Sequence, residues 1–309
     1  METSLARPIS PDCPDRFGGP GSKDRPTAAS AAFNERSDAS GSPLWAAHAA
    51  QWSLIGSPLR PHPQDLAIAQ RAVDLLAGES KWYALLLGVT SELASLRWPC
   101  GASLLAADLS DAMLRREWRS PPGCPSLAVR CRWQALPIAR TSLSLVLGDG
   151  SLSALPDVQA VREVLDQVAT AMRPDGCFVL RAYTRPDVPE SPRQVLDDLL
   201  GGRTPSMHVA KWRLAMALHG TLSSGVVLDR VWKVFRQAVP DSRRLAARTG
   251  WSIASIDTID AYRGSRSRYL FPTLAELRGL LSPRFDEVGC EHPTYELGDR
   301  CPTLTLRLH

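Results

Sequence analysis

The stretch of residues 83–113 constrains the fold more than any other part of the chain, because it predicts a βαβ unit. Residues 83–87 form a continuous apolar run, as expected for a strand covered on both faces of a parallel sheet. Gly88 interrupts the run at a turn. A second strand, residues 103–107, ends at Asp108, about 20 residues after Gly88, which is the spacing at which an acid in such a unit meets a ribose diol.

The turn from Gly88 to Glu92 discriminates between nucleotide-type ligands. A dinucleotide needs the glycine-rich G-x-G-x-x-G turn, so that a helix N-terminus can receive the pyrophosphate. This turn has a single glycine, and Val89 and Glu92 would crowd and repel a pyrophosphate. Thr90 or Ser91 can cap the helix that follows. The turn therefore favours a cationic nucleoside without phosphate. S-adenosylmethionine is such a ligand, with a sulfonium, an ammonium and a ribose.

Four segments in order resemble the motif series of a known family. They read LLLGVTSEL, AADLSDAML, LVLGDGSLSAL and MRPDGCFVLRAY. Together they are similar to the motifs of class I S-adenosylmethionine-dependent methyltransferases, in a branch whose first motif reads LGVT-x-E. The likeness covers roughly residues 52–183. It implies an α/β fold with a Rossmann-like seven-stranded sheet, S-adenosylmethionine as cofactor, and a transferase.

Charge, apolar runs and cysteine content restrict the classes of partner that we expect for this chain. The net charge of +4 over 309 residues is small and contains no block of Lys and Arg, which argues against nucleic-acid binding. The longest apolar runs are too short for a membrane span, and the N-terminus has no apolar signal segment. Seven cysteines without C-x-x-C spacing predict reduced thiols in a cytoplasmic protein. We therefore expect a small-molecule substrate, no nucleic acid, no membrane, no metal, and a monomer or homodimer.

The chain divides into four predicted parts. Residues 1–43 are rich in Pro, Gly, Ser and Asp and predict a disordered tail. Residues 44–185 predict the cofactor-binding core, and residues 186–267 a helical insertion that covers the active site. Residues 268–309 return to an α/β pattern. Their last two strands are expected to form an antiparallel pair that completes the core sheet, with the final strand between its neighbours.

The insertion shows helical spacing in several segments, and its polar residues leave two interpretations open. His208 and Lys211 share one of these helices and either line the pocket or lie on a solvated face; the pattern favours the solvated face. The segments with helical spacing are residues 191–200, 207–218, 227–239 and 253–262.

The adenosine half of the cofactor has three predicted contacts. Asp108 is expected to bind the ribose hydroxyls, although it can also cap a helix. The resemblance implies that Leu109 packs on the adenine. Arg132 stands where members of the family usually carry an acid for the adenine amino group. Gln134 is therefore predicted to supply an amide, unless backbone groups and stacking alone hold the ring.

The methionyl half is predicted at the ends of later strands and near the start of the core. Asp149, between two glycines, either contacts the methionyl ammonium, acts as a base toward an acceptor amine, or only forms a turn. Arg60 either pairs with the methionyl carboxylate or lies on the surface. Tyr183 and Asp149 are the residues expected at the reacting centre, as catalytic residues. The predicted cofactor contacts are Arg60, Gly88, Thr90, Glu92, Asp108, Leu109, Gln134, Gly148 and Asp149.

These features predict an enzyme that methylates a small molecule in secondary metabolism. A sulfonium already carries a good leaving group, so the lack of a catalytic triad is no objection. A first alternative is a cyclase that converts S-adenosylmethionine into azetidine-2-carboxylate and methylthioadenosine. A second alternative is a non-catalytic binding protein that kept the fold. The single glycine of the turn and Arg132 support this alternative.

Overall fold

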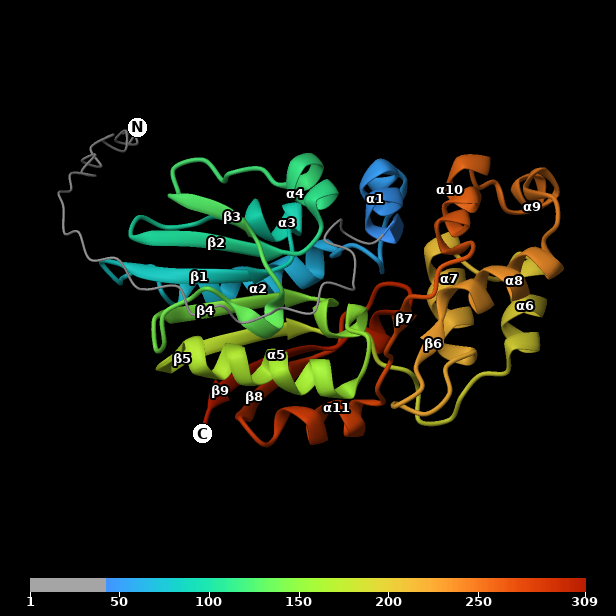
Figure 1. Ribbon diagram of the computed structural model, residues 1–309. Helices are drawn as coiled ribbons and strands as arrows, with labels where there is room; N and C mark the ends of the chain where they lie inside the picture. The colour runs from blue at the N-terminus through green and yellow to red at the C-terminus, as the bar shows by residue number, and fades with distance from the viewer. Residues whose placement is uncertain (1–42) are drawn as a thin grey trace, which may run out of the picture. The chain divides into compact units, whose positions relative to one another are not determined.

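The computed structural model describes residues 43–309, and a seven-stranded sheet forms the centre of this part of the chain (Figure 1). The predicted tail, residues 1–43, lies outside the described residues except for Pro43, which begins the first helix. The strands of the sheet are β1 (Trp82–Leu87), β2 (Ala102–Asp108), β3 (Ser126–Arg130), β4 (Leu143–Asp149), β5 (Met172–Arg181), β8 (Phe285–Glu291) and β9 (Thr303–Leu308).

The strand order is β3-β2-β1-β4-β5-β9-β8, with the first five strands parallel. The last strand, β9, runs antiparallel to both β5 and β8 and lies between them. This is the arrangement that the resemblance predicts, so the predicted fold class and the final antiparallel pair are confirmed. The chain extends the sheet from β1 through β2 and β3 on one side, and then through β4 and β5 on the other side of β1. The carboxyl ends of β1 and β4 therefore lie next to each other, at the point where open α/β sheets bind ligands.

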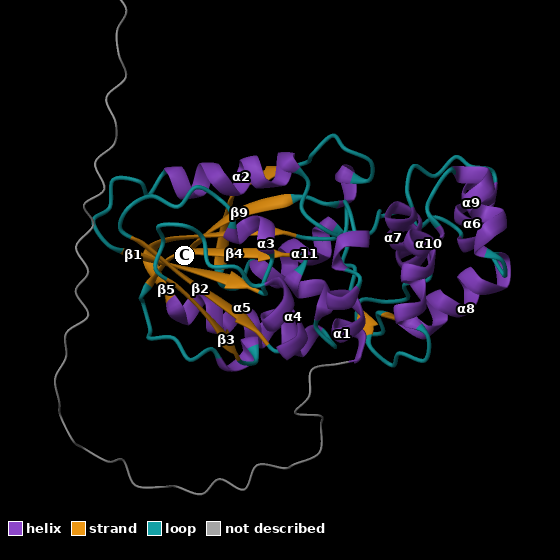
Figure 2. Cartoon of the chain, turned by 90° about the horizontal axis from the view of Figure 1, so that it is seen from above, coloured by secondary structure: helices purple, strands orange, loops and turns teal. Residues whose placement is uncertain are grey.

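Helices cover both faces of the sheet, and in Figure 2 α2 and α5 lie on opposite sides of it. On one face, Val164 and Val168 of α5 pack with Phe178 of β5, and α11 adds Leu277. On the other face, Val73 of α2 packs in a cluster with Leu86 of β1 and Leu104 of β2. The helices of the core are α2 (Pro63–Asp74), α3 (Ser91–Ala94), α4 (Asp111–Glu117), α5 (Val158–Ala171) and α11 (Leu274–Leu281).

The segment between β5 and α11 is mainly helical and has its own apolar cluster. The expected helices form with bounds that differ by one or two residues, except that α10 passes into a 3-10 turn (Thr258–Tyr262). One further helix, α9, was not predicted, because Leu245 is its only buried residue. The elements are α6 (Pro192–Leu200), α7 (Met207–Ala217), β6 (Val226–Val227), α8 (Leu228–Ala238), α9 (Ser242–Thr249), α10 (Ile253–Asp257) and β7 (Arg268–Tyr269).

The solvated face expected for His208 and Lys211 is wrong, because both side chains are buried. Lys211 is 0% exposed, and its ammonium group makes no hydrogen bond with a described residue. It lies over the ring of Tyr262, 5.6 Å from the ring centre. Burial lowers the pKa of Lys211 to about 7. The sequence pattern failed because α7 is buried nearly all round: nine of its 11 residues are buried, which leaves no broad face for water.

Candidate active site

A cavity of about 340 Å³ opens at the carboxyl ends of β1, β2 and β4. Its floor includes Gly88 after β1, Asp108 at the end of β2 and Asp149 at the end of β4. The opposite wall comes from α1 (Pro43–Ala50), the 3-10 turn Trp52–Leu54, α7 and β7. Seven of the predicted site residues line it: Gly88, Thr90, Asp108, Leu109, Gln134, Asp149 and Tyr183.

The turn after β1 requires its glycine. Gly88 has φ +107°, in a region that side chains rarely adopt, and its backbone N–H donates to the Ala107 carbonyl at 2.8 Å. The indole N–H of Trp133 donates to the same carbonyl at 2.6 Å, which fixes its ring beside Gly88. Thr90 occupies the N-cap position of α3, but its side chain makes no capping hydrogen bond. The turn thus presents backbone to the cavity without a phosphate-binding loop.

Asp108, at the end of β2, is the carboxylate that lies beside this turn. Its Oδ1 accepts from the backbone N–H of Ser110 at 2.7 Å, and its Oδ2 accepts from that of Val89 at 3.3 Å. Burial raises the pKa of Asp108 to about 6 from the ordinary 3.8, although these backbone donors oppose the rise. Asp108 also does not cap α4, because the hydroxyl of Ser110 does so. Each carboxylate oxygen accepts one backbone N–H and keeps a further lone pair that can accept a hydrogen bond from a ligand.

One side of the cavity, next to Asp108, carries an exposed leucine and an indole. Leu109 follows Asp108 and is 42% exposed, which is unusual for leucine and suits a platform for a flat ring. Trp133, Arg132 and Gln134 line the same side. From the sequence, no role was assigned to Trp133. Its position just after the third strand was the available signal.

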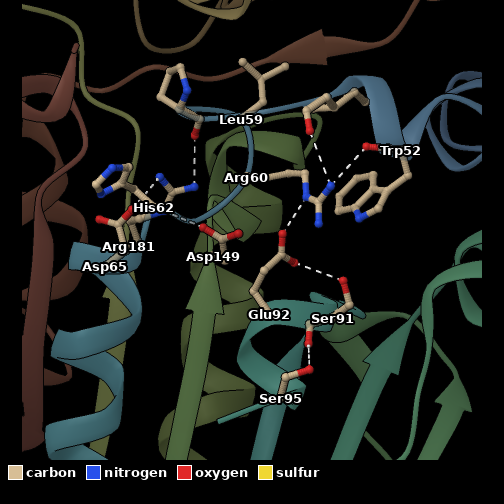
Figure 3. A network of polar contacts seen from close by, with 12 residues as sticks. Trp52, Leu59, Arg60, His62, Asp65, Ser91, Glu92, Ser95, Asp149 and Arg181 are labelled. Carbon is tan, nitrogen blue, oxygen red and sulfur yellow. Dashed lines mark hydrogen bonds and ion pairs between the residues drawn. The ribbon is translucent and has the colours of Figure 1, made fainter. Parts of the chain in front are cut away.

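Asp149 belongs to a buried charge network that sequence reasoning did not find (Figure 3). The Arg181 Nε donates to the Asp149 Oδ1 at 2.6 Å, and the Arg181 Nη1 lies 3.3 Å from the Asp65 Oδ2. All three side chains are at most 7% exposed. The hydroxyl of Tyr295 lies 3.0 Å from the Arg181 Nη1. Two carboxylates around one guanidinium leave a net charge of −1 beside the cavity when both are ionised.

Tyr183 lines the cavity with its ring, while its hydroxyl is held on the far side. That hydroxyl accepts from the Arg181 Nη2 at 2.9 Å and donates to the carbonyls of Pro58 and Leu59 at 3.1 and 3.2 Å. Burial raises the pKa of Tyr183 well above its ordinary value, so the phenol stays neutral. Tyr183 can therefore contact a ligand through its ring but does not supply a base.

Three predicted cofactor contacts lie outside the wall of the large cavity. Arg60 and Glu92 form an ion pair, with the Arg60 Nε 2.5 Å from the Glu92 Oε1, and Arg60 also donates to the Trp52 carbonyl at 3.2 Å (Figure 3). Gly148 lines a much smaller cavity beneath Asp149. Each of these residues would need a rearrangement to reach a ligand, so their roles stay predictions.

Replacing Gly150 with alanine is expected to destabilise the protein by about 3 kcal/mol, because two costs add. Gly150 has φ +59°, and a Cβ there would collide with the Cε2 of the buried Tyr183 ring. Gly123→Ala is the control, since Gly123 has φ +71° and nothing within 4 Å of the added carbon. Urea unfolding should show a loss of about 1 kcal/mol for that variant. Equal losses would contradict the predicted clash.

Comparisons with known proteins bear on the fold. No protein-family model matches the sequence, and the search of curated proteins finds no similar one. A solved structure of putative Zn-dependent alcohol dehydrogenases from Rhodobacter sphaeroides is similar with a TM-score of 0.54 and 12% identity, over 85% of this chain and 99% of that chain. At this identity the likeness concerns the fold alone, and the dehydrogenase name says nothing about this chain.

Two further structures are methyltransferases with bound S-adenosylhomocysteine. The 1,6-didemethyltoxoflavin-N1-methyltransferase of Burkholderia thailandensis has a TM-score of 0.46 and 15% identity, over 87% of this chain and 91% of its own. The N-methyltransferase NodS of Bradyrhizobium japonicum has a TM-score of 0.44 and 12% identity, over 83% and 91%. TM-scores of this size carry no weight in assigning a function, which must come from the site itself.

Proposed function

We propose that this chain, which has the Rossmann-like seven-stranded fold of the class I methyltransferases, is an S-adenosylmethionine-dependent methyltransferase that acts on a small molecule in secondary metabolism. One observation carries the proposal: the carboxylate of Asp108 stands at the end of β2, beside a single-glycine turn, in the wall of the cavity. A carboxylate in this position suits a ribose diol, and the turn beside it has no place for a pyrophosphate.

The adenosine half of S-adenosylmethionine fits the residues on this side of the cavity. Asp108 would accept hydrogen bonds from the two ribose hydroxyls. These bonds would replace part of the hydration that the carboxylate loses through burial. Leu109 and the ring of Trp133 would lie against the adenine, and Gln134 would supply an amide to its edge. None of these contacts needs the acid that the family usually carries at Arg132.

The methionyl half is cationic, and the charge of the adjoining network supports its binding. Only Oδ1 of Asp149 is hydrogen-bonded to Arg181, so Oδ2 is available for the methionyl ammonium. Asp65 holds the other side of the same guanidinium. The net negative charge of the three groups would attract the ammonium and the sulfonium. The ring of Tyr183 would add cation–π attraction of about 0.5–2 kcal/mol.

When bound, S-adenosylmethionine supplies an electrophilic methyl group with a good leaving group. The chain then has to orient the acceptor and to exclude water, and often needs little acid–base help. The wall formed by α1, α7 and β7 is suited to both tasks, because most of the side chains that line it are aromatic or aliphatic.

Free cysteines throughout the described residues fit the expected cytoplasmic location. Within residues 43–309, no helix is long and apolar enough to cross a membrane, and no cluster of side chains is placed to hold a metal ion.

Product analysis tests the proposal. The protein is incubated with S-adenosylmethionine that carries a labelled methyl group, together with an extract of small molecules, and the products are separated by mass spectrometry. Methyl transfer predicts S-adenosylhomocysteine and a labelled small molecule in equal amounts. Methylthioadenosine without labelled product would establish the cyclase instead. A mixture that does not change would favour the non-catalytic binding protein.

Binding of S-adenosylmethionine is expected to weaken as the pH falls from about 7 to 5, because the pKa of Asp108 in the free protein is about 6. Below this pKa the carboxyl group carries a proton, and binding through the carboxylate must expel it. Affinity should fall by up to about ten-fold per pH unit, as measured by calorimetry. Asp108→Asn, which has no titratable group, should bind weakly at every pH. An equal decline in both proteins would contradict the assignment to Asp108.

A further inference from the structure

Part of the cavity wall is not needed by the proposed cofactor contacts. This part lies opposite the ends of the strands and is mostly aromatic. It combines residues 44–52 with residues of α7 and β7, which are far apart in the sequence. Trp212 of α7 lies edge to face with Tyr183 at 5.1 Å and with Tyr269 at 5.4 Å between ring centres. The lining residues of this wall are Leu44, Trp45, His48, Trp52, Trp212 and Tyr269.

One imidazole stands in this apolar wall. His48 is 4% exposed and lines the cavity, and its ring nitrogens make no hydrogen bond with any described residue. Its ring packs edge to face against Trp45 at 5.4 Å and Tyr262 at 6.0 Å. Buried polar groups nearly always have a partner, so an imidazole that has none among residues 43–309 and lies in the wall of a cavity is expected to take its partner from the ligand.

The charge state of His48 decides what that partner can be. Burial first, and then the charge of Lys211, lower the pKa of His48 to about 3, so the ring is neutral at physiological pH. The titratable groups packed around it are Lys211 on α7 and Tyr262 in the 3-10 turn. A neutral imidazole has one nitrogen that accepts a hydrogen bond and one that donates. It therefore suits a neutral ligand with an O–H or N–H group.

We infer that the acceptor of this enzyme is a planar aromatic molecule with a hydroxyl or N–H group, held against the aromatic wall by its rings and oriented by a hydrogen bond to His48. This inference rests on the proposed function, because it assigns the part of the cavity that the cofactor leaves. His48 is a residue that binds and selects the acceptor. Arg268 of β7 also lines the cavity beside this wall, and Asp108 and Asp149 lie on its floor.

Three probes of similar size test the contributions of the aromatic rings and of the hydrogen-bond donor separately. Calorimetry is carried out with the full chain saturated with S-adenosylhomocysteine, and the probes are 2-naphthol, naphthalene and 2-decalol. 2-Naphthol has rings and a donor, naphthalene has rings alone, and 2-decalol has a donor on a non-aromatic frame. We expect 2-naphthol to bind most tightly, with naphthalene weaker by about two- to ten-fold through the loss of one hydrogen bond. We expect 2-decalol to be weaker than 2-naphthol through the loss of ring contacts.

Two variants tie the preference to His48. His48→Phe keeps a ring but removes both nitrogens, so 2-naphthol and naphthalene should bind to it with equal affinity. His48→Asn restores a hydrogen-bonding group and should recover part of the preference. Both variants should melt close to wild type and bind S-adenosylhomocysteine as wild type does, since His48 lies outside the proposed cofactor contacts.

The outcomes separate this inference from the proposed function. If wild type does not bind S-adenosylhomocysteine, the proposed function fails. If it binds the nucleoside but shows no preference for 2-naphthol over both other probes, or keeps that preference in His48→Phe, the inference about the acceptor is wrong and the proposed function stands.

Discussion

Replacing Asp108 with alanine is expected to weaken the binding of S-adenosylmethionine by about 100-fold or more. Two hydrogen bonds from ribose hydroxyls to a charged carboxylate would be lost, each worth about 1.5–3 kcal/mol. The variant should remain folded, because burial already disfavours the charged form of Asp108 and raises its pKa to about 6. Calorimetry measures the affinity, and thermal melting shows whether the fold is retained.

Asp111→Ala is the matched control for this loss. Asp111 lies three residues further on, at the start of α4, and pairs with the exposed Arg115 at 2.7 Å outside the cavity. Its replacement should change the affinity by less than two-fold, about what loss of a weak exposed ion pair allows. If Asp108→Ala bound as tightly as this control, the ribose would not be held by Asp108.

Replacing Arg181 with methionine is expected to destabilise the protein by about 3–5 kcal/mol, because a buried charge pair loses one partner. Methionine fills much of the volume of the side chain. It leaves Asp149 and Asp65 buried without their cation, and the carbonyl of Pro58 without the donor that lies at 3.0 Å. Urea unfolding at pH 7 measures the loss of unfolding free energy.

Arg284→Met provides the comparison, because Arg284 and Asp166 form an ion pair of 2.7 Å with side chains 55% and 52% exposed. Its loss should cost less than about 1 kcal/mol. The pH dependence gives a second criterion. Burial raises the pKa of Asp149 and Arg181 opposes the rise, so the pKa should rise further without Arg181. The deficit of Arg181→Met should therefore shrink as the pH falls and Asp149 takes up a proton. A small deficit, or one independent of pH, would contradict the proposed network.

The parts of the structure that follow from local pattern could be predicted from the sequence. The apolar run before Gly88, the acid at Asp108 and the alternation of strands and helices are all local. They suffice to predict the parallel sheet and the placement of Gly88 and Asp108 side by side at the ends of its strands. The antiparallel end of the sheet was also predictable, because the last two strands follow each other in the chain.

The charge network was not predictable, because its members are far apart in the sequence. Arg181 lies in a strand that otherwise reads as core, and Asp65, its partner, precedes it by 116 residues. The ion pair between Arg60 and Glu92 also joins residues 32 apart and could not be predicted from the sequence. The place of His48 in the cavity wall was not predictable either, because it depends on how α1 packs against the rest of the fold.

The central claim is that the cavity receives a sulfonium nucleoside and not a dinucleotide. Calorimetric titration of the wild-type chain with S-adenosylmethionine, and separately with NAD⁺, tests it most directly. The account predicts one molecule of S-adenosylmethionine bound per chain and no detectable heat with NAD⁺. Saturable binding of NAD⁺, or no binding of S-adenosylmethionine, would contradict it.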